Sequence, residues 1–342
     1  MGLIKPGKVV ALAGVVAGVM WVAVPQAIAA GATQVVGPQA SGVVFTVPSF
    51  TIPDVVAFQD RSNTLAQNGN LYSGGSLGKS VAAGTSPVVI PQSGAGYEVV
   101  YQASDHHWAE TGDAGTVETS FMMAAGTSPA AALSPGASDG PWKNAWQGSN
   151  GHLWAQGQDL GLPMAPNTSP SMVWLGTGYE ILYQASNHHL AEAGIFGTQD
   201  LGAAMAAGSS PIAVLSPGAP GAYQIAWQGS NGDLWASGPN GGTDLHVAMA
   251  PNTSPGMVWL GTGYEVVYQA SDHHWAEAGV AGTTETSFVM AAGTSPVAVL
   301  SPSGSDGSWK NAWQGSNGDL WAQGVDLGVA MAPNTSPGIG VL

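Results

Sequence analysis

The chain has 342 residues, with 50 glycines, 23 prolines and 13 tryptophans but no cysteine. Only 8% of its residues are charged, and 6 basic against 21 acidic residues give a formal net charge of −15. Binding of nucleic acid requires clustered lysine and arginine, so this composition excludes nucleic acid as a partner. The lack of cysteine excludes disulfides, thiolate chemistry and cysteine-based zinc sites.

The first thirty residues predict a secretory signal peptide over residues 1–29. Two lysines precede an uncharged apolar run at residues 9–24, and a small-residue segment follows at residues 27–29. This order of features is typical of export signals, although an uncleaved membrane anchor is an alternative. We therefore expect a secreted or cell-envelope protein with no stable membrane span after cleavage, and a linker at residues 30–43.

A Ser-Pro step recurs through the remaining chain at intervals of 41 to 44 residues. The prolines of these steps are Pro87, Pro129, Pro170, Pro211, Pro255, Pro296 and Pro337. A period this regular indicates a repeat architecture. Residues 55–59 align with residues 265–269, so a first unit lies upstream and seven units run from about residue 44 to Pro337.

The sequence of each unit predicts four short strands. In residues 256–296 we expect strands at 257–260, 264–269, 275–277 and 287–290. Proline cannot donate within a strand ladder, so each Ser-Pro step should precede a strand. No segment has helical periodicity of useful length. The pattern predicts an all-β fold, a seven-bladed β-propeller; a pair of β-sandwiches or a β-solenoid is the less favoured alternative.

The end of the chain predicts how the ring closes. Residues 337–342 repeat the opening strand of a unit, and we expect 338–342 to pair with the first blade, so that strands from both ends of the chain close the ring. The alternative is that residues 43–47 supply this strand. The expected blades span about 44–87, 88–129, 130–170, 171–211, 212–255, 256–296 and 297–337.

Two recurring positions are expected to be structural. Units two to seven each carry an aromatic pair at i and i+4, which lies on one face of a strand and should form the core between blades. These pairs are Tyr97/Tyr101, Trp142/Trp146, Tyr179/Tyr183, Tyr223/Trp227, Tyr264/Tyr268 and Trp309/Trp313. A glutamine also recurs in one position of all seven units, and we expect its amide to tie a loop to the blade.

A second aromatic set begins the third strand of most units, with Leu190 in the fourth. The turn before it contains Asn-Gly in the odd units. In the even units the turn contains His-His and, in this alignment, is one residue shorter. An indole beside polar turn residues could stack on a sugar ring while amides and carboxylates bind the hydroxyls. It could equally close the groove between blades. The candidate sugar-binding residues are Trp108, Trp154, Trp235, Trp275 and Trp321, the turn residues Asn150, Asn231 and Asn317, and the acceptors two positions beyond, Glu110, Glu277, Gln156 and Gln323.

Metal binding and catalysis are not expected. The histidine pairs at residues 106–107, 188–189 and 273–274 lie on turns of different blades, so they should not converge on one ion, and no cofactor is indicated. A single arginine, Arg61, excludes the arginine cluster of a sialidase. The carboxylates of the third strand recur once per even unit, unlike the unique pair of a glycosidase.

The motifs at residues 263–270, 292–296 and 317–321 resemble repeats of secreted actinobacterial proteins. The last of them, Asn-Gly-Asp-Leu-Trp, is also loosely similar to a motif of β-propeller lectins of the tachylectin, tectonin and Photorhabdus types. This resemblance implies sugar binding in grooves between or on blades, through Trp154, Trp235, Trp321 and their turns. The even units depart from it through the His-His turn and Leu190.

Together these observations predict a secreted, multivalent and non-enzymatic binder of neutral glycans. The alternative is an envelope scaffold that binds protein partners on the propeller face.

Overall fold

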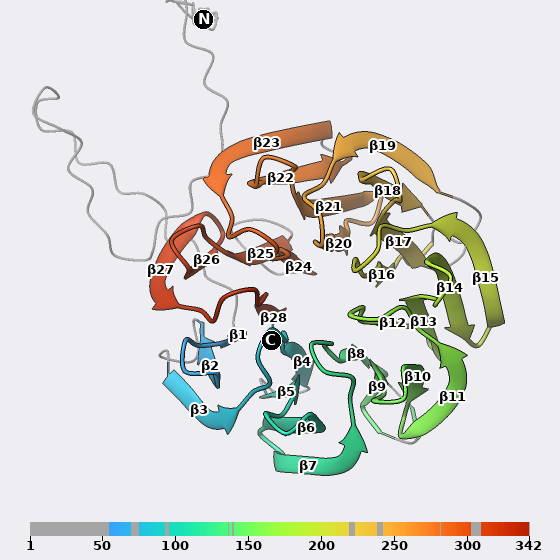
Figure 1. Ribbon diagram of the computed structural model, residues 1–342, viewed down its shortest axis with the longest axis vertical. Helices are drawn as coiled ribbons and strands as arrows, with labels where there is room; N and C mark the ends of the chain where they lie inside the picture. Colours follow the sequence, from blue (N-terminus) through green and yellow to red (C-terminus); the bar gives the residue numbers. More distant parts are fainter. Residues whose placement is uncertain are drawn as a thin grey trace, which may run out of the picture.

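The computed structural model describes residues 55–341, except 70–74, 93–95, 136, 139, 219–222, 238–241, 281 and 302–308. These residues form 28 strands in seven four-stranded antiparallel sheets, arranged as blades around a central axis (Figure 1). The predicted seven-bladed β-propeller is confirmed. The expected signal peptide, linker and start of the first unit, residues 1–54, lie outside the described residues. Within the described part, no helix is long and apolar enough to cross a membrane.

The strands of each blade follow the chain from the axis outward, and only blade 1 takes its innermost strand from the other end of the chain. Blade 1 contains β28 (Gly338–Gly340), β1 (Val55–Gln59), β2 (Thr64–Asn68) and β3 (Gly75–Ser80). Blade 2 contains β4 (Val88–Gln92), β5 (Gly96–Gln102), β6 (His107–Gly112) and β7 (Gly115–Met122). Blade 3 contains β8 (Ala130–Leu133), β9 (Trp142–Gln147), β10 (His152–Ala155) and β11 (Gln158–Pro163). Blade 4 contains β12 (Ser171–Trp174), β13 (Tyr179–Gln184), β14 (His189–Gly194) and β15 (Gly197–Ala204).

The remaining three blades repeat the same order. Blade 5 contains β16 (Ile212–Leu215), β17 (Tyr223–Gln228), β18 (Asp233–Ser237) and β19 (Thr243–Ala248). Blade 6 contains β20 (Gly256–Trp259), β21 (Tyr264–Gln269), β22 (His274–Gly279) and β23 (Gly282–Val289). Blade 7 contains β24 (Val297–Leu300), β25 (Trp309–Gln314), β26 (Asp319–Ala322) and β27 (Val325–Ala330). Each innermost strand of blades 2 to 7 starts directly after its Ser-Pro step, as predicted.

The ring closes through the last strand of the chain. β28 pairs antiparallel with β1, with Val55 opposite Gly340 and Ala57 opposite Gly338. Gly338 is required here, because a Cβ atom at this position would lie 2.5 Å from the backbone oxygen of Pro87. The predicted closure by residues 338–342 is confirmed, and the position considered for residues 43–47 is filled by β28.

A ring of serines links the blades next to the axis. The serine of each Ser-Pro step donates its backbone N–H to the side-chain oxygen of the next one, at 2.8 to 2.9 Å. The members are Ser86, Ser128, Ser169, Ser210, Ser254, Ser295 and Ser336. The Ser-Pro period is thus a hydrogen-bonded belt as well as a strand boundary.

The recurring glutamine ties each blade to the connection that follows it. Its Nε2 donates to the carbonyl of an alanine in that connection at 2.8 to 3.2 Å, as from Gln102 to Ala124. The N–H of the same alanine donates to the backbone oxygen of the glutamine in the next blade. The seven residues are Gln59, Gln102, Gln147, Gln184, Gln228, Gln269 and Gln314, all at most 2% exposed. The predicted structural role is confirmed.

The interfaces between blades alternate in composition. Where an even blade meets the next odd one, tryptophan is part of the contact, as for Trp108 and Trp146 between blades 2 and 3. Where an odd blade meets the next even one, tyrosine packs on aliphatic residues, as for Tyr101 against Leu65 between blades 1 and 2. The aromatic pairs therefore form the core between blades, as predicted.

Candidate functional site

The strand register corrects the alignment of the second aromatic set. Trp108 lies opposite Gln102, whereas Leu153 lies opposite Gln147 and Trp154 comes one residue later, opposite Trp146. A shift of one residue turns a side chain to the other face of a strand. The even and odd turns therefore have the same length, and the first histidine of each even turn occupies the glycine position of the odd turns. Leu190 does replace the even-blade tryptophan, because it lies opposite Gln184.

The five candidate tryptophans consequently fall into two groups. Trp108 and Trp275 belong to the core, with 5% and 6% of their surface exposed, and a sugar could reach their ring faces only if neighbouring side chains moved. Trp108 stacks on Trp142 at 5.9 Å between ring centroids. Trp154, Trp235 and Trp321 are half-buried, and each stacks on the second-strand tryptophan of its own blade at 6.0 Å. Only this second group retains an accessible edge.

In the odd blades, the structure brings these tryptophans together with the predicted asparagines. In blade 3, Trp154 donates its Nε1–H to Oδ1 of the exposed Asn150 at 3.2 Å. The Asn150 amide donates in turn to Asp159 of β11 at 2.7 Å. Equivalent clusters are Asn231, Trp235 and Asp244 in blade 5, and Asn317, Trp321 and Asp326 in blade 7. Three equivalent sites thus combine an indole, an amide and a carboxylate at the outer part of the ring.

The four predicted acceptors do not join these clusters. Gln156 follows the far end of β10 with a φ of 50°, and its backbone N–H donates to the side chain of Asn144 at 3.1 Å. Gln323 is held in the same way by Asn311. The register places Glu110 level with Ala155, so Glu110 and Glu277 are not the equivalents of Gln156 and Gln323. Both glutamates are half-buried on the core side, and burial raises the pKa of each carboxyl.

Each even blade also carries a second, buried glutamate. Glu98, Glu180 and Glu265 are at most 2% exposed, on the second strand of the even blades. Burial raises the pKa of Glu180 to about 7, and the nearby Glu192 adds to this rise. Glu192 accepts a hydrogen bond of 2.6 Å from the hydroxyl of Tyr223 in blade 5. These acids lie inside the interfaces and are poor candidates for contact with a large ligand.

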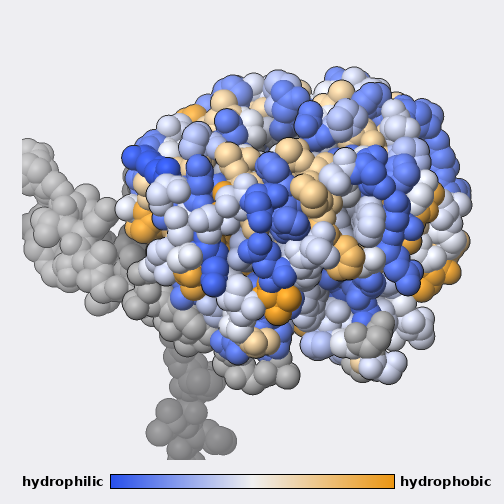
Figure 2. Space-filling view, turned by 60° about the horizontal axis from the view of Figure 1, so that its bottom comes forward, coloured by the Kyte–Doolittle hydropathy of each residue, from blue (hydrophilic) through white to orange (hydrophobic). Residues whose placement is uncertain are grey.

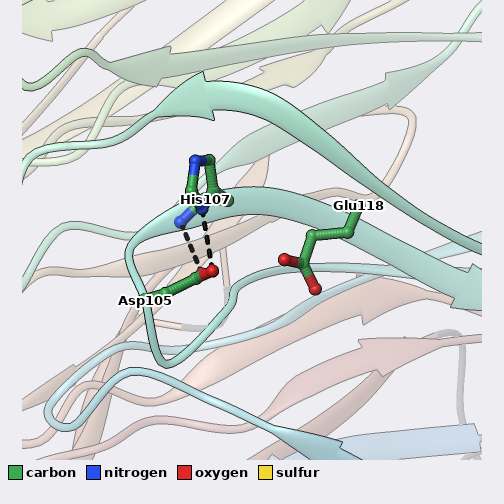
Figure 3. Close-up of side chains that lie close together, drawn as sticks. All are labelled: Asp105, His107 and Glu118. Carbon is green, nitrogen blue, oxygen red and sulfur yellow. Dashed lines mark hydrogen bonds and ion pairs between the residues drawn. The ribbon is translucent and has the colours of Figure 1, made fainter.

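The adjacent histidines of the even turns point in different directions. His106 points to Gln102, with 3.4 Å between Nδ1 and Oε1. His107 turns instead toward the carboxylate of Asp105, and Glu118 of β7 faces this pair (Figure 3). The ligand atoms of Asp105, His107 and Glu118 lie within 4.8 Å of one another, and blade 6 repeats the group with Asp272, His274 and Glu285. These residues could hold a metal ion.

An apolar cavity of about 1100 Å³ lies beside the innermost strands of blades 3 to 7. Its rim includes the ends of the innermost strands, with Trp174, Trp259 and the exposed side chains of Leu133, Leu215 and Leu300. No charged residue lines it among the described residues. The outer surface is different in character, since hydrophilic residues dominate the view in Figure 2 and hydrophobic ones are scattered.

The carboxylates of the outermost strands were missed by the sequence interpretation. They are Glu118, Asp159, Asp200, Asp244, Glu285 and Asp326. In blades 3, 4 and 7 the aspartate begins an Asp-Leu-Gly sequence, and in blade 5 an Asp-Leu-His sequence. This recurrence was the available signal, because an acid at one fixed position per blade must face the same surroundings in each.

No protein-family model and no curated protein matches the chain. Among solved structures, the BP39L lectin of Burkholderia pseudomallei superposes with a TM-score of 0.56 and 14% identity, over 83% of this chain and 97% of that chain. An Aleuria aurantia lectin in complex with Fucα1-6GlcNAc gives a TM-score of 0.48 and 20% identity, over 69% and 91%. AofleA of Arthrobotrys oligospora gives 0.48 and 16%, over 69% and 81%. The likeness is one of fold.

Proposed function

We propose that this propeller is a secreted, multivalent lectin that binds neutral glycans at the repeated clusters of its odd blades. The observation that carries the proposal is the threefold recurrence of a half-buried tryptophan bonded to an exposed asparagine, as in Trp154 and Asn150. Sugar rings present one apolar face and several hydroxyls, which an indole edge with amide and carboxylate groups can contact together.

Two further observations support this proposal. The net charge of −15 disfavours acidic glycans and leaves neutral ones as the favoured class. The BP39L structure, which shares the fold over most of both chains, is itself a lectin. Export would follow from the signal peptide expected at residues 1–29, and recognition of surface or cell-wall glycans needs no catalytic step.

A glycan array on the labelled protein tests the proposal. Wild type is compared with a Trp154→Ala, Trp235→Ala, Trp321→Ala variant and with an Asn150→Ala, Asn231→Ala, Asn317→Ala variant, whose exposed changes disturb packing less. We expect binding of neutral glycans by wild type and its loss in both variants. Each single change should weaken the avidity on the order of tenfold, because three weak sites act together.

A control variant separates loss of binding from loss of fold. Val117→Ser changes an exposed hydrophobic residue of the outermost strand of blade 2, outside the odd-blade clusters. It should leave glycan binding unchanged. If both triple variants still bind glycans, the sugar-binding site lies elsewhere on the protein. If the wild-type protein binds no neutral glycan, the lectin proposal is excluded.

The second candidate function is a non-catalytic scaffold of the envelope. The apolar cavity favours it, because the exposed leucines that line it are suited to an apolar protein partner. Two results together would support this function over the lectin. The protein would bind no glycan, and the proteins that it pulls down would be lost after Leu215→Ser and Leu300→Ser.

A further inference from the structure

Blades 2 and 6 carry the same three potential metal ligands at the same three positions. Asp105, His107 and Glu118 correspond to Asp272, His274 and Glu285, each 167 positions further along the chain. In both blades the carboxylate oxygen of the aspartate lies 2.9 Å from Nδ1 of the histidine. Each glutamate comes from the outermost strand, which the ladder holds against the strand of the histidine.

The other blades show what normally fills this position. In four of them an asparagine stands where Asp105 stands in blade 2, and its amide donates to the aspartate of the outermost strand. The bonds are Asn150 to Asp159 at 2.7 Å, Asn187 to Asp200 at 2.8 Å, Asn231 to Asp244 at 2.9 Å and Asn317 to Asp326 at 2.8 Å. In blades 2 and 6 the donor is replaced by a second carboxylate. Two like charges then face each other with no amide N–H between them, which is unfavourable unless a cation is shared.

The histidine provides a second and independent observation. In blades 3 and 4 the equivalent imidazole forms a hydrogen bond with the aspartate of the outermost strand, as between His152 and Asp159 at 3.2 Å. In blades 2 and 6 the Nδ1 atoms of His107 and His274 are buried, and each lies 2.9 Å from a carboxylate oxygen of the aspartate in its own turn. The imidazole and this aspartate therefore lie together, with their ligand atoms within 4.8 Å of those of the glutamate on the outermost strand.

A third cluster of potential metal ligands in the described residues differs, because an amide bridges its carboxylates. Asp233, Asp244 and His246 also lie close together in blade 5. However, the amide of Asn231 donates to both carboxylates, at 3.0 and 2.9 Å, and the His246 side chain is 85% exposed. Its charges are already bridged by N–H groups, so it serves as an internal contrast.

We propose that the two triads each bind one divalent transition-metal cation, and that zinc fits their donors best. One imidazole nitrogen and two carboxylate oxygens are ligands that Zn²⁺ accepts at about 2.0–2.2 Å. Ca²⁺ and Mg²⁺ prefer six or more oxygen ligands, which the triads do not supply. Three protein ligands leave at least one coordination position open to solvent or to a ligand.

Isothermal titration of the full-length, tag-free protein with Zn²⁺ alone tests the proposal. We expect two ions per chain for wild type, one for Asp105→Asn and none for Asp105→Asn with Asp272→Asn. Asparagine is the residue found at this position in four other blades, so these variants should keep the fold, which thermal unfolding checks. Ca²⁺ should bind at least tenfold more weakly than Zn²⁺.

Two control variants make the result specific. Asp200→Asn removes a carboxylate of blade 4 that an amide already holds, and His106→Gln with His273→Gln removes the neighbouring imidazoles. Both should still bind two ions. The proposal is overturned if wild type takes up no zinc, if the double aspartate variant still binds two ions, or if the His106 and His273 changes abolish binding. The readout involves no sugar, so it stands apart from the lectin proposal.

Discussion

Ser336 donates its backbone N–H to the side-chain oxygen of Ser86 at 2.9 Å, across 250 positions of the sequence. The same bond joins every other pair of neighbouring blades between residues close in sequence, so this one completes a circle. We expect Ser86→Ala to lower the free energy of unfolding by about 1 kcal/mol, because the Ser336 donor loses its acceptor. Denaturant unfolding measures this. Ser149→Ala, on an exposed turn, should have no effect; equal values for the two variants would contradict a structural role for the belt.

The glutamine ties can be tested in the same way. Gln147→Leu removes the bond to the Ala165 carbonyl, measured at 3.1 Å, while keeping a side chain of similar size. We expect a loss of about 1–2 kcal/mol in the free energy of unfolding, since a buried acceptor loses one of its donors. The matched control is Gln158→Leu, at an exposed position of β11. A loss below that of the control would show that the blades do not depend on this tie.

His106 adopts a left-handed backbone conformation, with a φ of 71°, in the position that Gly151 occupies in blade 3 with a φ of 79°. A residue with a Cβ is strained there and glycine is not. We expect His106→Gly to raise the free energy of unfolding by about 0.5–1 kcal/mol. Gly151→Ala should lower it by a similar amount, because no atom lies near the added Cβ and only the backbone strain remains. Effects of the same sign in both variants would refute the equivalence of the two turns.

The buried carboxyl of Glu180 makes stability depend on pH. Burial, with Glu192 nearby, raises its pKa from the ordinary 4.5 to about 7 in the folded protein. The folded state therefore binds a proton more tightly than the unfolded one, and stability should fall as pH rises from 4.5 through 7. Glu180→Gln removes this dependence, so the variant should gain melting temperature over wild type above pH 7. Asp113→Asn, an exposed turn residue, is the control, and parallel melting curves for Glu180→Gln and wild type would disprove the effect.

Much of this fold could be predicted because each sequence signal recurs in several repeats. The Ser-Pro steps marked the start of the innermost strands, the i, i+4 aromatic pairs marked the core, and the match between residues 337–342 and the start of a unit gave the closing strand. Each of these signals depends on spacing within one strand, which sequence reports directly.

The site was harder to predict because it depends on the alignment of one strand with another. Trp108 and Trp154 look equivalent when turns are compared by their tryptophans, yet a one-residue difference places them on opposite faces. Only the pairing of the strands shows that His106 takes the place of Gly151. The contact between Asn150 and Asp159 also requires two strands to be folded together, and neither residue indicates it alone.

The alternation of interfaces has a consequence at the closing strand. Tryptophan-rich and tyrosine-rich contacts can alternate without interruption only around an even number of blades, and here there are seven. Blades 7 and 1 are both odd, and they meet through smaller residues such as Ala312 and Ile339 around Phe58. The mismatch of parity therefore falls next to blade 1, where the ring is closed only by the pairing of β28 with β1. We expect mechanical opening of the ring to begin with the separation of these two strands.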